Sequence, residues 1–188
     1  MSYPLPPEPC LSMPEEIILS VDPSLRGTGY AVLARRDGKT RALEFGRVAN
    51  PPALPVEQCL LAIHECLDAL IARHSPSCMA VESVIYVQSY RTAIVLGAAR
   101  GAVLLSAARR GLPVHEYAPR KVKQAVVGRG AAQKQQVGFM VRVLLGLTET
   151  PQEDAADAIA VGLTHFAAID SVRAFAKPPP GPALRRGA

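Results

Sequence analysis

The stretch that decides the fold is residues 17–33, IILSVDPSLRGTGYAVL. Its first five residues are mostly apolar and rich in β-formers, and this run stops at Asp22, which Pro23 follows at once. The pattern predicts a strand that ends in a carboxylate. Gly27 and Gly29 can adopt positive φ, and a second apolar run resumes at Tyr30. The stretch therefore predicts a β-hairpin.

The residues that follow predict a sheet crossed by a long helix. Residues 41–48 alternate imperfectly and predict a third antiparallel strand, and residues 55–73 carry apolar side chains at steps of three and four, as on one face of a helix: Val56, Leu60, Ile63, Leu67, Leu70 and Ile71. A second short apolar run, residues 78–81, again ends in a carboxylate, Glu82. Because it follows a helix, we expect it to lie parallel to the first strand, with Asp22 beside Glu82.

Residues 92–110 predict a helix that is apolar on most of its circumference and buried on two sides. Gly97 and Gly101 lie four residues apart, which suits a close backbone approach, either by the sheet or by the same helix of a second subunit. Residues 113–117 predict a fifth strand, and Pro119 begins another helix.

The last helix carries two more acids near its predicted start. Thr150, Pro151 and Glu153 form the pattern of a capping box, with threonine as the N-cap. Asp154 and Asp157 are three residues apart and share a face of the first two turns. The apolar, alanine-rich run to Phe166 argues against a solvated face.

The charge is unevenly distributed. The chain has 188 residues and a formal net charge of +5, and residues 109–142 hold eight basic side chains against the single acid Glu116. Such a stretch, with Gly128 and Gly130 allowing close backbone approach, suits a nucleic-acid phosphate backbone, and a merely solvated basic face is the alternative. Carboxylates beside it suit hydrolysis with two Mg²⁺ ions about 4 Å apart.

Composition predicts one compact domain with two tails. We expect a disordered proline-rich tail at residues 1–14, a nuclease domain at residues 15–170, and a flexible proline- and arginine-bearing tail at residues 171–188. A secretory signal and a long uncharged apolar run are not evident, so a cytoplasmic protein with no membrane contact is expected. Cysteines lack a Cys-x-x-Cys pair and the histidines are scattered singly, which predicts reduced thiols and no histidine ligand.

Taken in order, these motifs resemble the RuvC-type Holliday-junction resolvases, the crossover junction endodeoxyribonucleases. The similarity runs from about residue 16 to 168 and rests on Asp22-Pro23 with residues 27–30 (GTGY), Glu82, residues 96–101 (LGAARG), residues 122–128 (VKQAVVG) and residues 154–158 (DAADA). The resemblance implies an α/β, ribonuclease-H-like fold with a five-stranded mixed sheet flanked by helices.

The resemblance also implies an activity: metal-dependent, symmetrical nicking of four-way DNA junctions in recombination and repair. It implies two Mg²⁺ ions per site, with Mn²⁺ as a substitute, a homodimer joined at the glycine-bearing helix, and a branch-migration complex of the RuvA/RuvB type as partner. The expected metal-binding catalytic acids are Asp22, Glu82, Asp154 and Asp157. The expected DNA-binding residues are Lys123, Lys134, Arg120, Lys121, Arg129 and Tyr86.

This chain departs from the family pattern at two positions, Ser24 in place of a glycine and Ile85 in place of an aromatic residue, with the aromatic Tyr86 next to it. Three other hypotheses remain from the sequence. One is another ribonuclease-H-like nuclease, and one is a junction-binding module without catalysis. The third is a sugar kinase or actin-like ATPase, which shares the opening hairpin but normally needs a longer chain and a second phosphate loop.

Overall fold

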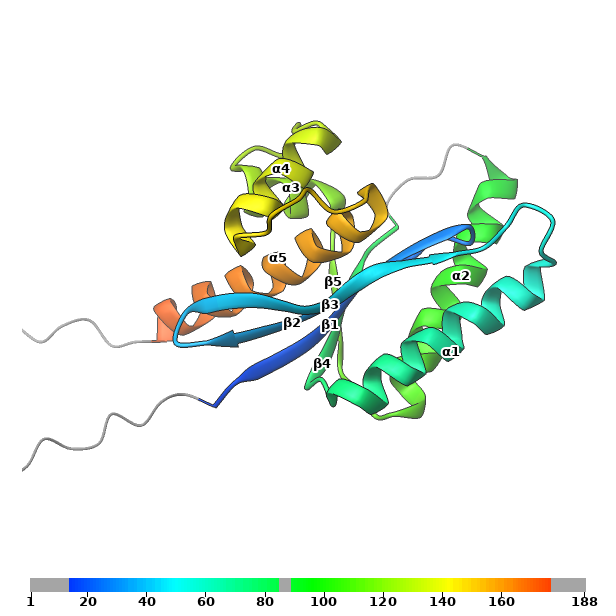
Figure 1. Ribbon diagram of the computed structural model, residues 1–188, viewed down its shortest axis with the longest axis horizontal. Helices are drawn as coiled ribbons and strands as arrows, with labels where there is room; N and C mark the ends of the chain where they lie inside the picture. The colour runs from blue at the N-terminus through cyan, green and yellow to red at the C-terminus, as the bar shows by residue number, and fades with distance from the viewer. Residues whose placement is uncertain (1–13, 85–88, 177–188) are drawn as a thin grey trace, which may run out of the picture.

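The computed structural model describes residues 14–84 and 89–176. Within them, five strands form one mixed sheet in the order β3-β2-β1-β4-β5 (Figure 1). The elements, in chain order, are β1 (Glu16–Asp22), β2 (Gly27–Arg36), β3 (Lys39–Ala49), α1 (Val56–His74), β4 (Cys78–Glu82), α2 (Tyr90–Arg109), β5 (Val114–Tyr117), α3 (Pro119–Val127), α4 (Lys134–Leu145) and α5 (Glu153–Ala176). β1 pairs antiparallel with β2 and parallel with β4. The expected five-stranded mixed sheet is confirmed.

Helices cover both faces of the sheet: α1 and α2 lie on one side, and α3, α4 and α5 on the other (Figure 1). Because side chains alternate along each strand, β1 gives Leu19 and Val21 to the core under α1 and α2, and Ile18 to the core under α5. Asp22 lies four residues after Ile18 on the same strand, so its side chain points to the same face of the sheet, toward α5.

The β2–β3 hairpin sets which residues of β3 face α5. Its two-residue turn, Asp37 and Gly38, has φ values of 50° and 76°, as a tight turn between twisted strands needs. The pairing then shifts by one residue between Val32 and Leu33, as in a β-bulge. This shift pairs Arg47 with Gly29 and turns Arg47 toward α5.

α2 differs from the expectation that it is buried on two sides. Ala99, Val103 and Ala107 are buried, but the opposite side is exposed in the single chain. A Cβ atom added at Gly97 or Gly101 would meet nothing within 4 Å, so neither glycine serves an approach by the sheet.

Among the described residues, two helices, α2 and α5, are long and apolar enough to cross a membrane by length and composition alone. Both carry charged side chains, so neither contains the long uncharged run that the sequence lacks. More than half of the apolar window of α5 is buried in the structure. In the fold, α5 lies against the sheet, which accounts for its apolar character, whereas α2 lies against α1 with 22% of its apolar window buried.

The start and end of α5 also differ from expectation. The helix begins at Glu153, with the Ala156 amide donating to the Gln152 carbonyl at 2.8 Å, so Thr150 is not its N-cap. Thr150 instead lies against Gly138 of α4, where its methyl group would be 3.2 Å from an added Cβ. At the other end, the helix includes residues 171–176, which were expected in the flexible tail. The tail predictions for residues 1–13 and 177–188 lie outside the described residues.

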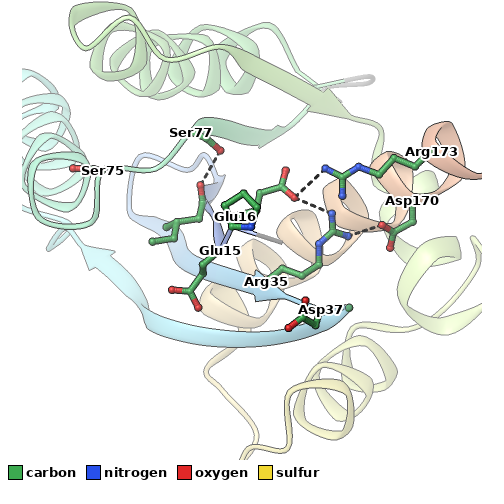
Figure 2. Close-up of a pocket in the computed structure, with 11 residues that line it drawn as sticks. Glu15, Glu16, Arg35, Asp37, Ser75, Ser77, Asp170 and Arg173 are labelled. Atoms are coloured by element: carbon green, nitrogen blue, oxygen red, sulfur yellow. Dashed lines mark hydrogen bonds and ion pairs between the residues drawn. The ribbon is translucent and has the colours of Figure 1, made fainter. Parts of the chain in front are cut away.

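The end of the sheet remote from Asp22 holds a hollow of about 450 Å³. Arg35 lies between two acids there, with Nη2 2.9 Å from Glu16 Oε2 and Nη1 2.8 Å from Asp170 Oδ1 (Figure 2). Arg173 lies 3.7 Å from the same Glu16 oxygen. These acids therefore already have cationic partners.

Candidate active site

Asp22 and Glu82 lie side by side where two parallel strands end. Val21 of β1 pairs with Val81 of β4, and each strand ends at the next residue. Parallel pairing of neighbouring strands brings their carboxyl ends to the same edge of the sheet. The two acids are neighbours, as expected, and both face α5.

Gly29 on β2 and Arg47 on β3 continue the row of side-by-side residues that Asp22 and Glu82 begin at this edge of the sheet. Asp22 pairs with Gly29 on β2, and Gly29 pairs with Arg47 on β3. Cross-strand neighbours point to the same face, so Arg47 also faces the site. The absent side chain at Gly29 leaves the middle of the row open to α5.

α5 fills that opening with Asp154. A Cβ atom at Gly27 would lie 2.7 Å from Asp154 Oδ2, and one at Gly29 would overlap the Asp154 carbonyl oxygen. Neither glycine has a positive φ, although the sequence suggested that role for both. They are needed because the first turn of α5 comes close to the hairpin, which brings Asp154 and Asp157 to the strand-borne acids.

The acids repel one another in a partly buried place. The pKa of Asp22 is raised to about 8 from its ordinary 3.8, first by burial and then by the charges of Glu82 and Asp157. Burial and the charge of Asp157 raise the pKa of Glu82, while a hydrogen bond from Asp22 lowers it. Burial is also the first cause of the raised pKa of Asp157, which Lys134 opposes. The cluster therefore favours a bound proton or cation.

Two basic side chains contact the acids on α5. Arg47 Nη1 lies 3.2 Å from Asp154 Oδ2. Lys134 Nζ lies 3.7 Å from Asp157 Oδ2 and forms a shorter ion pair with Glu153, whose hydrogen bond is the first cause of the raised pKa of Lys134. Asp22 and Glu82 have no ion pair within the described parts of the chain.

The expected DNA-binding residues divide into two groups. Lys134, Lys123 and Arg120 lie near the acids: the charge of Lys123 lowers the pKa of Glu82, and Arg120 lines a cavity of about 390 Å³ with Asp22 and Glu82. The second group, Lys121 and Arg129, shows no contact with them.

Lys121 Nζ lies 5.3 Å from the centre of the Tyr117 ring, and Arg129 follows the left-handed Gly128 in the α3–α4 loop. Tyr86 lies outside the described residues.

Oxygen donors alone converge at this site: two carboxylates from strand ends and two from the first turns of α5. Hard divalent cations prefer such ligands, and the mutual repulsion that raises the pKa of Asp22 is what a bound cation would relieve. A carboxylate cluster beside basic side chains suits metal-dependent phosphodiester hydrolysis. The fold and site thus define a class, the metal-dependent nucleases.

The comparison with protein families identifies the family within that class. The family model described as "Crossover junction endodeoxyribonuclease RuvC" matches residues 18–165. The chain belongs to the RuvC family of crossover junction endodeoxyribonucleases. It is 53% identical over 157 residues to the RuvC of Akkermansia muciniphila, covering 84% of this chain and 94% of that protein, and 45% identical over 150 residues to the RuvC of Saccharophagus degradans, covering 80% and 87%.

Solved structures support the fold. The Thermus thermophilus RuvC in complex with a Holliday junction matches with a TM-score of 0.75 and 32% identity, covering 82% of this chain and 96% of that one. The yeast mitochondrial Holliday junction resolvase Ydc2 matches with a TM-score of 0.56 at 12% identity, covering 85% and 84%, which shows the fold alone. The expected ribonuclease-H-like fold and the enzyme class are confirmed.

Arg47 is the contact to the acids that sequence reasoning missed. Its pairing with Asp154 depends on the register shift between β2 and β3, which places Arg47 opposite Gly29. The sequence carried no signal for this shift, and the adjacent Gly46 faces Tyr30 on the other side of the sheet, where an added Cβ would lie 2.8 Å from the Tyr30 hydroxyl.

Proposed function

We propose that this chain resolves four-way DNA junctions by symmetrical, metal-dependent hydrolysis of opposed strands, in recombination and repair. The observation that carries the proposal is the convergence of four carboxylates from β1, β4 and α5 beside Lys123 and Lys134. Membership of the RuvC family supports the substrate, as does the likeness to a Thermus thermophilus RuvC whose structure contains a Holliday junction.

In this proposal Asp22 would be the central ligand, because the charges of Glu82, Asp157 and Asp154 all act on it. Glu82, Asp154 and Asp157 complete the ligand set. Two bound Mg²⁺ ions, or Mn²⁺ in their place, would supply an activated water and neutralise charge on the leaving oxygen. Divalent cations bound there would hold the four carboxylates deprotonated by neutralising the repulsion that, after burial, raises the pKa of Asp22.

The chain's own basic groups hold the DNA. Lys134 and Lys123 lie beside the acids, so we assign them to the scissile-phosphate region. Arg120, which lines a cavity with Asp22 and Glu82, contacts a phosphate next to the site, while Lys121 and Arg129 contact phosphates farther along the strands. Tyr86 stacks on a base at the opened junction. Arg47 pairs with the carboxylate of Asp154 before the cations and the DNA arrive, and competes with a cation for it.

A homodimer fits the exposed side of α2. Ile94 and Leu105 are 55% and 54% exposed, and Gly97 and Gly101 lie between them with open space above each. Small residues four apart let two helices approach closely, and Ile94 and Leu105 would supply apolar contact. A second copy on this face would give two active sites for two opposed strands. We further propose a cytoplasmic location and a branch-migration complex of the RuvA/RuvB type as partner.

The proposal is tested with a labelled synthetic four-way junction, a linear duplex of the same sequence and an RNA/DNA hybrid, each in Mg²⁺ and in EDTA. Paired nicks at symmetrical positions in the junction alone, with Mg²⁺ alone, are expected, together with a dimer in sedimentation. Cleavage of the hybrid or of the duplex at the same rate as the junction would overturn the assignment of the four-way junction as substrate. Tight binding without cleavage in either Mg²⁺ or Mn²⁺ would overturn the catalytic role.

A further inference from the structure

Three residues that the sequence scatters come together between α5 and the outer edge of the sheet. Cys78 begins β4, His115 lies on β5, and His165 lies on α5. The register pairs Ala80 with His115, so Cys78, two residues earlier on β4, points to the same face. One ligand atom from each residue lies within 4.8 Å of the other two. The four acids of the active site do not belong to this cluster.

The closest pair already has the spacing of two ligands on one ion. Cys78 Sγ lies 3.3 Å from His165 Nε2, and the His115 and His165 ring centres are 4.7 Å apart. Tetrahedral zinc, with bonds of about 2.3 Å to sulfur and about 2.0 Å to nitrogen, holds such atoms about 3.5 Å apart. Because His115 is exposed, its side chain has room to turn toward the other two ligand atoms, which lie within 4.8 Å of its own.

Tyr117 orients the central ligand. Its hydroxyl lies 2.8 Å from His165 Nδ1. When Nδ1 donates its proton to this oxygen, the lone pair of Nε2 points at Cys78, as in metal sites where a second hydrogen bond fixes the histidine tautomer. Burial, followed by the charge of His115, lowers the pKa of His165 to about 4, so the ring is neutral at neutral pH.

We propose that Cys78, His115 and His165 form a binding site for a thiophilic transition-metal ion such as zinc, with water in the fourth position. The donor set of one thiol and two imidazoles suits such ions, whereas the all-oxygen active site suits harder cations. Cys78 and His165 are buried and His115 is exposed, which leaves a route from solvent along β5. Burial raises the pKa of the Cys78 thiol to about 11, so binding must release one proton from sulfur to solvent.

An ion at this site would tie together three elements. β4 carries Glu82 at its opposite end, and α5 carries Asp157 two turns before His165. The ion would also hold the edge strand β5, which within the described residues pairs on one side alone. Its expected effect is therefore on stability. The proposal does not depend on the nuclease function.

Cobalt titration of the full-length, EDTA-treated protein tests the site, because a thiolate ligand gives Co²⁺ an intense near-ultraviolet charge-transfer absorption that carboxylates cannot give. One equivalent of Co²⁺ should produce the band, and Zn²⁺ should remove it. Cys78→Ser should abolish it, and Tyr117→Phe should weaken Co²⁺ binding about tenfold. Cys66→Ser, Cys10→Ser and Asp157→Asn are the controls and should keep it.

His115→Ala is the second test variant, because its exposed side chain can be removed without disturbing the core. It should weaken Co²⁺ binding at least about tenfold and leave the circular dichroism spectrum unchanged. The proposal is overturned if the native protein gives no thiolate band, if the band survives Cys78→Ser, or if it is lost in Cys66→Ser. Equal Co²⁺ affinity in His115→Ala and the native protein would overturn the assignment of His115.

Discussion

The two ends of the central sheet handle acidic residues in opposite ways. At the far end, Glu16 and Asp170 bracket Arg35, which also donates to the Phe166 carbonyl at 3.1 Å (Figure 2). At the other end, Asp22 and Glu82 lie together with no ion pair in the described residues, and the pKa of Asp22 is raised to about 8. At the far end, the chain's own arginines pair with the acids and satisfy their charge. At the other end, Asp22 and Glu82 need a proton or a cation from solution.

The difference shows that burial of acids does not by itself mark a site. Glu16 is buried to a similar extent as Asp157, with side chains 24% and 23% exposed, yet Glu16 pairs closely with Arg35, whereas Asp157 lies among other acids and its pKa is raised. Unpaired buried charge is costly, and folded proteins seldom keep it without a function. The contrast therefore separates structural acids from metal-binding acids.

The largest expected effect distinguishes the ends by activity. Asp157→Asn keeps the shape of the side chain but removes a charged oxygen ligand, so junction cleavage in Mg²⁺ should fall by about 10³-fold or more, which is about 4 kcal/mol. Asp170→Asn is the matched control at the satisfied end and should cleave at the native rate. Single-turnover cleavage at saturating protein measures both. Comparable losses of cleavage in Asp157→Asn and Asp170→Asn would contradict the distinction between metal-binding and structural acids.

A second effect distinguishes the ends by stability. Arg35→Met removes a guanidinium that is 7% exposed, which leaves the Phe166 carbonyl without this donor and Glu16 with the more distant Arg173. The free energy of unfolding should fall by about 2–3 kcal/mol, measured by urea denaturation. Arg41→Met, which breaks the exposed pair with Glu15, should cost less than about 0.5 kcal/mol. Cleavage per folded molecule should not change in either variant, and a strong loss in Arg35→Met would mean that the two ends are coupled.

The third effect is a pH dependence that only the acid end should show. Because the native pKa of Asp22 is raised, the metal-free protein retains a proton that the unfolded chain has already released above its ordinary pKa of 3.8. Stability should therefore fall as the pH rises toward about 8 and level off above it.

Asp22→Asn should remove most of this fall, and the raised pKa values of Glu82 and Asp157 account for the rest. In EDTA the variant should be more stable than the native chain by about 1–2 kcal/mol near pH 8 and equal to it near pH 4. Mg²⁺ should raise the Tm of the native chain at the higher pH and leave that of the variant nearly unchanged. A variant that is less stable than the native chain at both pH values would contradict the repulsion argument.

The features of the fold and site that could be predicted from the sequence are those that depend on residues within one element or on directly connected elements. Asp22 and Glu82 were predictable as neighbours, since each ends an apolar run and a helical crossover makes the strands parallel. The start of α5 was not predicted correctly, because Thr150 packs against Gly138 of α4 instead of capping the helix. The roles of Gly27 and Gly29 were misjudged for a similar reason, since the required contact comes from Asp154.

Two features had no signal that a single sequence could provide. The cluster of Cys78, His115 and His165 draws one residue from each of three elements, and its geometry depends on how α5 lies across the sheet. Arg47 faces the site only because the β2–β3 pairing shifts by one residue. Counted from the Asp37–Gly38 turn without that shift, Arg47 would oppose Thr28 and point to the other face.

The smallest effect concerns Arg47, which pairs with Asp154 at the acid end as Arg35 pairs with acids at the far end. It neutralises Asp154 in an ion pair whose two side chains are 43% and 31% exposed, so its loss should cost less than about 1 kcal/mol of stability. Because Arg47 competes with a divalent cation for the same carboxylate, Arg47→Ala should lower the Mg²⁺ concentration for half-maximal cleavage by about threefold. Arg41→Ala, on the same strand but paired with Glu15, is the control and should not shift it. A Mg²⁺ requirement that rises in Arg47→Ala would show that the arginine orients Asp154 for the metal more than it competes, and that the acid end is partly satisfied by the chain after all.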